Sequence, residues 1–320
     1  MVKMPVTVKW LVVFALFLFA FELLLRFCLG LGSPALTVEH PRIEYMFAPN
    51  QEIKRFGNRF KTNPWGMRSE NFPRWKLDHS QLRILVIGDS IVNGGHPTDH
   101  SRLATTIVQR TLEKQLNRSV VVGNISAGSW GPGNWLAYVQ EFGFFDSDYF
   151  IIVAGSADYL DTPTFEPLNP NTHPTRNPLC ATSELFQRYL AKYVPKFTSA
   201  PKSETTENDL ADDIALEDLS QLILLAKRNV SKVGLIQYLA RVEIIESQTA
   251  NGYVEIKGVA ESTRIPSLDT RTWFKPENSS IDFRDEIHPN DAGQKLLAKA
   301  ILTLLSSELQ LAIDPNLLCE

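Results

Sequence analysis

Two short motifs, far apart in the chain, carry the residue types that acyl transfer needs. Ser90 ends the run GDS directly after four apolar residues, and much later Asp285 stands three residues before His288. A serine hydroxyl is a weak nucleophile until a base removes its proton, and an imidazole oriented by a carboxylate is the usual base. An Asp at this spacing can bond ring Nδ1 of the histidine and leave Nε2 free to accept the serine proton. Either motif alone is more typical of a capped turn or a surface loop, but together they predict a catalytic site.

Both motifs also resemble blocks of a known family. Gly88–Gly95 reads GDSIVNGG and Asp285–Gly293 reads DEIHPNDAG. These stretches resemble the first and fifth blocks of the SGNH (GDSL-type) hydrolases, and the resemblance extends over about residues 80 to 310. It implies that Ser90, His288 and Asp285 are the catalytic residues of an esterase that needs no cofactor and no metal.

The loop Asn124–Gly133, NISAGSWGPG, resembles the second block of the family, which supplies a glycine backbone. Strict spacing puts that position at Ser129, and a slip of one residue puts it at Gly128. The resemblance implies an oxyanion hole made by the backbone N–H of Ser90 and of one of these two residues, aimed at the oxygen that becomes negative. A Gly/Pro turn around a packed Trp130 is the alternative interpretation.

The third block departs from the family. The run GSAD fits the Gly-x-Asn-Asp frame, but Ala157 stands where the family has its Asn. Loss of one oxyanion donor typically lowers turnover by ~10²–10³-fold, so the departure affects the expected efficiency more than the chemistry. Ser156, Asn134 and Asn93 are neighbouring candidates to replace the missing amide.

Other polar residues near these motifs are weaker candidates. His96 and His100 lack further ligands at helpful spacing, so we expect a solvent-facing loop that contacts substrate rather than a metal site. Asp158 and Asp161 have the residue types of an acid/base pair. We favour instead a hydrogen-bonded Asp that orders the loop after a strand.

Elements of alternating type must position these residues. Apolar runs predict strands over 83–87, 120–122, 149–154 and 232–239. Helical spacing predicts helices over 103–115, 135–142, 181–193, 210–227 and 291–309, the last capped by Asn290. This alternation predicts a three-layer α/β/α domain with a central parallel sheet, in which sites form at the carboxyl ends of the strands. Pro289 keeps His288 out of the last helix, on a loop.

The N-terminal region predicts a membrane anchor. Residues 10–20 are all apolar, and the apolar character continues to Leu31 with interruptions at Glu22 and Arg26, which can pair at i and i+4. About 22 residues cross a hydrocarbon core of ~30 Å. Lysines at positions 3 and 9 favour a cytoplasmic N-terminus with the rest exported. We favour a retained anchor; a signal peptide cleaved near Ser33 is the alternative.

The predicted organisation has five parts: a cytoplasmic N-terminus (1–9), a transmembrane anchor (10–31), an extracytoplasmic arm (32–80), an SGNH-like hydrolase domain (81–312) with a flexible insertion near 198–208, and a tail (313–320). In the arm, a Gly-Met-Arg element ending at Arg68 is interpreted as part of a β-hairpin that packs on the core rather than as a substrate contact. An oxidising compartment would let Cys180 and Cys319 pair, but two unpaired thiols are favoured.

The chain has 320 residues and a formal net charge of −4, which gives no indication of a nucleic-acid partner. The resemblance implies a serine esterase that removes small acyl groups, such as O-acetyl, from a cell-surface or exported polysaccharide. An O-acyltransferase with the same triad is the second hypothesis, and an impaired binding or assembly module is the third. The expected partners are an acylated glycan, the bacterial inner membrane through the N-terminal helix, and other polysaccharide-assembly proteins. The catalytic domain is expected in the periplasm or outside the cell.

Overall fold

Runs of aliphatic residues form the strands of a central sheet. The computed structural model describes residues 5–190 and 208–318, the side chains of residues 208–213 excepted. Its sheet has five parallel strands in the order β6–β5–β7–β8–β9. Their bounds are β5 Leu82–Gly88, β6 Val120–Ser126, β7 Tyr149–Gly155, β8 Lys232–Tyr238 and β9 Ser267–Asp269. Strand β5, which lies between β6 and β7, is buried along its whole length, because helices cover both of its faces.

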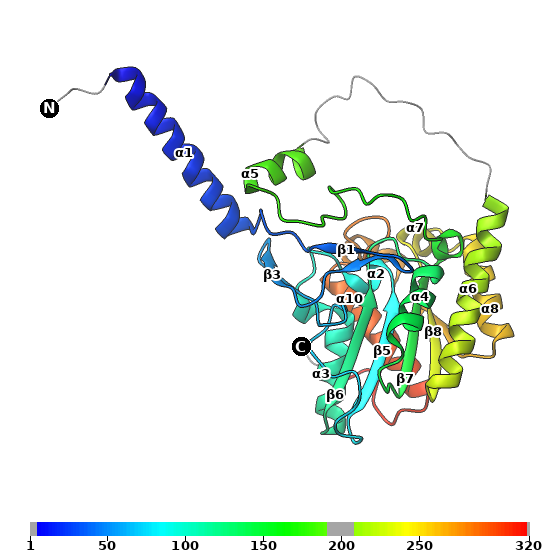
Figure 1. Cartoon of the computed structure of the whole chain (residues 1–320). Helices are drawn as coiled ribbons and strands as arrows, with labels where there is room; N and C mark the ends of the chain where they lie inside the picture. The colour runs from blue at the N-terminus through cyan, green and yellow to red at the C-terminus, as the bar shows by residue number, and fades with distance from the viewer. Residues whose placement is uncertain (1–4, 191–207, 319–320) are drawn as a thin grey trace.

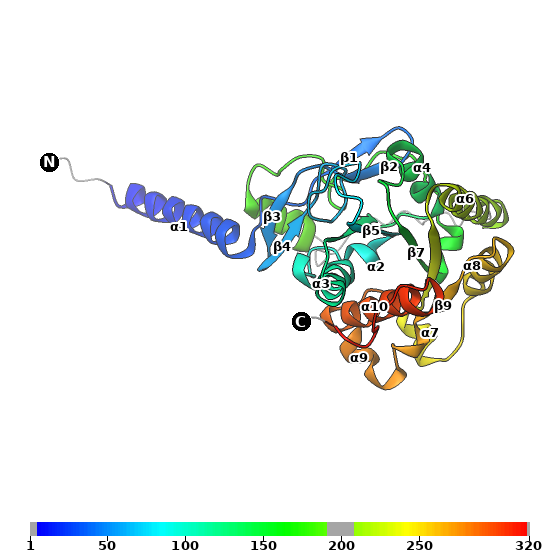
Figure 2. The ribbon, with the colours of Figure 1, turned by 90° about the horizontal axis from the view of Figure 1, so that it is seen from below.

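Helices cover the two faces of the sheet and make three layers (Figure 2). One face packs against α3 and α10, and the other against α4, α6 and α8. The helices are α3 Ala104–Leu116, α4 Pro132–Phe142, α6 Asn208–Asn229, α8 Asn251–Ser262 and α10 Asp291–Thr303. The predicted α/β/α class with a central parallel sheet is therefore confirmed.

Shorter elements connect these layers. They are α2 Ser90–Asn93, α5 Ala181–Glu184, α7 Arg241–Ile245 and α9 Ser279–Asp282, with short turns at His100–Arg102 (η1), Ser156–Leu160 (η2), Leu185–Leu190 (η3), Thr270–Thr272 (η5), Pro276–Asn278 (η6) and Leu304–Glu308 (η7). The helix predicted over 181–193 is α5 followed by the π-helical turn η3, and its last residues lie outside the described part of the chain. Nearly all of the predicted insertion 198–208 and Cys319 also lie outside it.

The segment ahead of the sheet forms two antiparallel hairpins, in keeping with the β-hairpin favoured from the sequence. They are β1 Thr37–His40 with β2 Glu44–Phe47, and β3 Glu52–Arg55 with β4 Asn58–Lys61. Tyr45 and Met67 are buried in the same core cluster as β5. The hairpins therefore lie on the carboxyl edge of the sheet, where they close one side of the site described below.

A single long helix, α1 (Val6–Leu29), projects from this body (Figure 1). It is long and apolar enough to cross a membrane, and its apolar side chains are almost all exposed. Its charged pair forms as predicted by spacing, with Arg26 Nε 2.7 Å from Glu22 Oε1. The helix ends at Gly30, which adopts the left-handed conformation common at helix C-termini.

Candidate active site

Ser90 stands at the carboxyl end of β5 because the chain turns sharply there. A Cβ at Gly88 would lie 2.6 Å from Val92 Cγ2 and 2.8 Å from the Val153 carbonyl oxygen, so the turn has room only for glycine. The Asp89 carboxylate then caps α2 by accepting the N–H two residues further on, at 2.8 Å. Ser90 is the first residue of this helix, so its own backbone N–H has no acceptor within the helix.

The structure brings together the three residues that the sequence paired. Ser90 Oγ lies 2.9 Å from His288 Nε2, and His288 Nδ1 lies 2.9 and 3.0 Å from the two carboxylate oxygens of Asp285. When Nδ1 carries the ring proton, it donates to Asp285 and Nε2 accepts the serine hydroxyl. This is the donor order that general-base activation of a serine requires.

Hydrogen bonds also keep the Asp285 carboxylate ionised. Burial by itself raises the pKa of Asp285, but the backbone N–H groups of His288 and Ile287, at 2.7 and 2.9 Å, and the ring of His288 hold that pKa below its ordinary value. A carboxylate that stays charged fixes the ring orientation and stabilises an imidazolium.

The loop that carries His288 is tied down on several sides. Tyr238 donates to the carbonyl of Ile287 at 3.0 Å, and Asn290 caps α10 as predicted. Arg284 joins this loop to the other half of the site, because it donates to the carbonyl of Gly94 at 2.9 Å. The nucleophile loop and the histidine loop are therefore directly bonded to each other.

The loop after β6 brings a second backbone to the nucleophile. Gly128 borders the same cavity as Ser90, and a Cβ added at Gly128 would meet open space. Its carbonyl oxygen accepts a hydrogen bond from the hydroxyl of Tyr45. Ser129 adopts a left-handed conformation with φ of 57°, and Trp130 is buried behind it. Of the two candidate oxyanion residues, Gly128 is the one that lines the cavity.

The position of the missing family Asn is exposed. Ala157 lies in η2, two residues beyond β7, the strand beside β5. Of the three candidate substitutes, Ser156 donates to a carboxylate of α7 at 2.7 Å and Asn134 to the carbonyl before β2 at 2.8 Å. Asn93 donates to the carbonyl and hydroxyl of the last residue of β6, at 3.2 and 3.3 Å. Each polar group is thus engaged elsewhere.

A buried group of carboxyls lies behind the nucleophile. Burial raises the pKa of Asp89 to about 7, and burial together with the nearby Asp89 raises that of Asp158. Burial raises the pKa of Asp161 to about 6, with Glu44 adding to the shift. Asp158 accepts the backbone N–H of Gly155 at 2.7 Å, which matches the interpretation favoured from the sequence, a carboxyl that orders the loop after the strand.

Asp89 is expected to make folding stability fall as pH rises. Its folded pKa of about 7 exceeds the ordinary value of ~3.9, so between these pH values the folded state binds the extra proton and its stability declines with increasing pH. Asp89→Asn keeps the capping oxygen but cannot ionise. We expect its melting temperature in detergent to fall less than that of the wild type between pH 5 and pH 8.

The matched control is Asp78→Asn. Asp78 is exposed and, like Asp89, accepts the backbone N–H of the residue two positions further on, but its pKa is lowered rather than raised. This change should not flatten the dependence of the melting temperature on pH. Equal slopes in the wild type and Asp89→Asn would contradict a buried, protonated Asp89.

A cavity of about 220 Å³ opens at Ser90 and His288. Much of its wall comes from the N-terminal hairpins and the segment before α6, through Tyr45, Phe60 and Arg188. These three were not identified from the sequence. The short hairpin strands have no long periodic pattern, and Arg188 lies in a stretch predicted only as a helix.

Histidines 96 and 100 differ in their surroundings. His96 borders the cavity, and burial, followed by the charges of nearby arginines, lowers its pKa to about 3, so the ring is neutral. His100 is buried rather than solvent-facing, with Nε2 3.5 Å from Glu70. The expectation of a solvent-facing loop is therefore wrong for His100. Among the described residues, no three His, Cys, Asp or Glu side chains gather as metal ligands.

Arg68 supports the loop that follows the nucleophile. It is fully buried, donates to the carbonyl of Asn93, and donates to those of Gly95 and Thr98 at 2.6 Å each. Its guanidinium lies 4.3 Å from the ring centre of Phe60. The contacts of Arg68 are the packing contacts favoured for the Gly-Met-Arg element.

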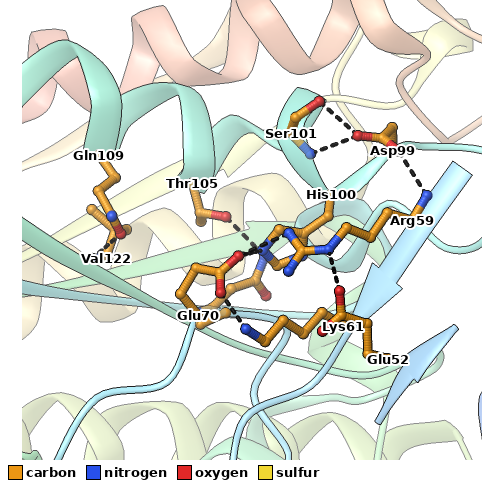
Figure 3. A network of polar contacts seen from close by, with 12 residues as sticks. Glu52, Arg59, Lys61, Glu70, Asp99, His100, Ser101, Thr105, Gln109 and Val122 are labelled. Atoms are coloured by element: carbon orange, nitrogen blue, oxygen red, sulfur yellow. Dashed lines mark hydrogen bonds and ion pairs between the residues drawn. The ribbon is translucent and has the colours of Figure 1, made fainter.

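A network of ion pairs and hydrogen bonds also supports the loop after Ser90 (Figure 3). Arg59 of β4 pairs with Glu52 and Glu70 at 2.8 Å, and its backbone N–H donates to Asp99 at 2.7 Å. Glu70 also contacts Lys61. Exposed pairs of this kind contribute little singly, but the network bonds the second hairpin to the loop after Ser90.

A parallel sheet that carries a serine and an Asp-x-x-His pair at its carboxyl edge is the arrangement of an acyl hydrolase. The chain matches the GDSL-like lipase/acylhydrolase family over residues 86–296, well over half of its length, and it belongs to that family. It is accordingly a hydrolase that acts on ester bonds. No curated protein matches the chain.

Among solved structures, an acetylxylan esterase from Geobacillus stearothermophilus is similar, with 17% identity over 72% of this chain and 97% of that one and a TM-score of 0.47. A catalytic mutant of the same enzyme gives 18% identity over 69% and 92%, with a TM-score of 0.45. An α/β hydrolase enzyme from the metagenome of Lake Arreo, Spain, gives 15% identity over 73% and 98%, again with a TM-score of 0.45.

Proposed function

We propose that the protein is a membrane-anchored serine esterase that removes small acyl groups, O-acetyl above all, from a cell-surface or exported polysaccharide. The observation that carries the proposal is the 2.9 Å hydrogen bond between Ser90 Oγ and His288 Nε2, continued from Nδ1 to Asp285. Geometry of this kind supports an activated serine within a family of acyl hydrolases.

In the proposed mechanism, Ser90 Oγ attacks the ester carbonyl while His288 takes the hydroxyl proton. The oxygen of the tetrahedral intermediate accepts backbone N–H groups of Ser90 and Gly128. His288 then gives the proton to the departing sugar hydroxyl, which leaves an acyl group on Ser90. Water, deprotonated by His288, attacks this acyl-enzyme, and His288 returns the proton to Ser90 Oγ as the acyl–oxygen bond breaks, which releases a carboxylic acid and free Ser90.

The size of the cavity supports a small acyl group. About 220 Å³ lies between Ser90 and the hairpin side chains Phe47 and Phe60. This space suits an acetyl group and part of one sugar, and it is too small for a long fatty acyl chain. His96 and Arg188 add polar groups to the wall that suit a sugar.

The anchor and the exported location are part of the same proposal. In this reading α1 stays attached in the bacterial inner membrane and residues 32–320 face the periplasm, with the hydrolase domain near 81–312. Burial of Leu25 and Leu31 against Ala181 supports a retained helix, since cleavage near Ser33 would remove two side chains from this contact.

The test is hydrolysis of a chromogenic acetyl ester by the full chain in detergent, with and without an acetylatable polysaccharide. Release of the chromophore that does not need the polysaccharide supports the esterase. Release that depends on the polysaccharide, with acetyl groups found on it afterwards, would replace the esterase by an acyltransferase. An intact fold without release or transfer would contradict both and favour a binding module.

Ala157→Asn is expected to raise kcat/KM for the acetyl ester by ~10-fold or more, below the ~10²–10³ ceiling for one oxyanion donor. The reason is that Ser156, Asn134 and Asn93 are bonded elsewhere, so no side chain there replaces the amide. Ala157→Gln is the matched control, because its side chain carries the amide one methylene further from the backbone. Equal effects of Asn and Gln, or none, would contradict a missing donor at this position.

A further inference from the structure

The C-terminal end of α1 bonds directly to the domain that follows it. Glu22 accepts the backbone N–H groups of Ala181 and Thr182 at 2.7 and 2.9 Å, so it caps the start of α5. Arg26 donates to the carbonyl of Leu179 at 3.1 Å. Figure 1 shows α5 beside the C-terminal half of α1.

A buried ion pair continues the attachment into the body. Arg55 and Glu184, both fully buried, lie 2.7 Å apart. Arg55 also donates to the carbonyl of Gly30 at 3.0 Å, and Glu184 accepts the N–H of Gly32 at 2.6 Å. Because breaking one side of a buried pair leaves an uncompensated charge, we expect this junction to resist movement of α1 relative to the body.

The depth of the bilayer along α1 follows from its length. A hydrocarbon core of ~30 Å takes about 20 helical residues, so a span that begins at Trp10, the start of the predicted anchor, ends near Leu29, one turn beyond Arg26. Arg26 is the residue that binds Leu179, ahead of α5. The segment Leu179–Leu190 therefore lies at the level where hydrocarbon gives way to headgroups.

That same segment presents large apolar side chains that the described residues leave exposed. Leu179 is 99% exposed and Phe186 is 57% exposed, and on α1 itself Phe27 is 83% exposed. Phe56 of the second hairpin, also exposed, lies edge-on to Tyr189 at 5.8 Å between ring centres. Contiguous exposed apolar side chains mark interaction sites, and aromatic residues favour the membrane–water interface.

We propose that Leu179–Leu190 lies on the bilayer surface, with Leu179 and Phe186 inserted among the lipid chains. The occupant of the exposed apolar surface that we propose is lipid, because this surface continues from a helix that is long and apolar enough to cross a membrane. The inference rests on the proposed anchor. Since Arg188 of this segment lines the cavity at Ser90, it places one wall of the active site next to the membrane.

The test measures lipid contact by single fluorophores on the full chain in vesicles. Native cysteines 28, 180 and 319 are first changed to serine; Cys180 caps α5, a role that serine fills well. The environment-sensitive fluorophore NBD is then attached through Phe186→Cys, or through Leu179→Cys as a second site. The vesicles contain phosphatidylcholine with either ordinary or brominated acyl chains, which quench NBD on contact.

Two further positions make the result decisive. Val13→Cys lies within the proposed span, and Val254→Cys lies on α8, 60% exposed, on the side of the body away from α1 in Figures 1 and 2. We expect brominated lipid to quench NBD at positions 13, 186 and 179 but not at 254. Quenching at 13 without quenching at 186 and 179 would overturn this inference and leave the anchor intact. No quenching at 13 would overturn the anchor and the inference together.

Discussion

Ser90→Ala is expected to lower kcat/KM for an acetyl ester by ~10⁴-fold or more, and to abolish covalent labelling by a fluorophosphonate. The expected loss is this large because the hydroxyl 2.9 Å from His288 Nε2 is the group that forms the acyl-enzyme in the proposed mechanism. Alanine retains the backbone N–H, so binding and any oxyanion stabilisation remain. Turnover rates and mass spectrometry of the labelled protein measure the two effects.

The matched control is Ser262→Ala, which removes an exposed serine hydroxyl on α8. That variant should be labelled and turn over as the wild type does. A Ser90→Ala protein that is still labelled would show that another residue is the nucleophile, and the triad would have to be abandoned.

The nucleophile and its partner were visible in the sequence because each depends on local information. Ser90 directly follows a continuous apolar strand, and Asp285 and His288 are three residues apart on one loop. Pro289 and Asn290 mark where the last helix begins, which the structure places at Asp291. The spacing predicted the Asp–His hydrogen bond, and the parallel sheet then placed both loops at one edge.

The walls of the site were not visible, because they depend on contacts between distant segments. Tyr45 and Phe60 belong to hairpin strands of four residues, too short for a periodic pattern. The contact of Tyr45 with Gly128 joins the N-terminal segment to the loop after β6. Nothing local to either residue indicates this contact.

Two elements of the fold were missed for a related reason. β9 has only three residues and lies at the edge of the sheet, and α8 contains Gly252 and Gly258, which weaken a helical pattern. In both cases packing against β8 or the core decides the conformation. The resemblance predicts that Ala157 stands where the family has an amide, but only the structure shows that the amides of Asn134 and Asn93 bond elsewhere.

Asp285→Asn is expected to lower kcat by up to ~10⁴-fold with little change in KM, because Asp285 contacts His288 and not the cavity. The backbone N–H groups of Ile287 and His288 would hold the amide oxygen where the carboxylate oxygen now lies. The amide NH₂ would then face ring Nδ1 and force the ring proton onto Nε2. A protonated Nε2 cannot accept the hydroxyl of Ser90.

Misplacement of the ring proton and loss of charge predict different orders of activity among variants of Asp285. Asp285→Ala removes the carboxylate but leaves the ring free to choose its tautomer, so it should be less damaging than Asp285→Asn. Glu286→Gln is the matched control, since this neighbouring carboxylate is exposed and pairs only with Arg241 in the described residues. A steady-state comparison of the three variants decides the point. If Asn is as active as the wild type, or Ala is much worse than Asn, Asp285 does not act by fixing the proton on His288 Nδ1.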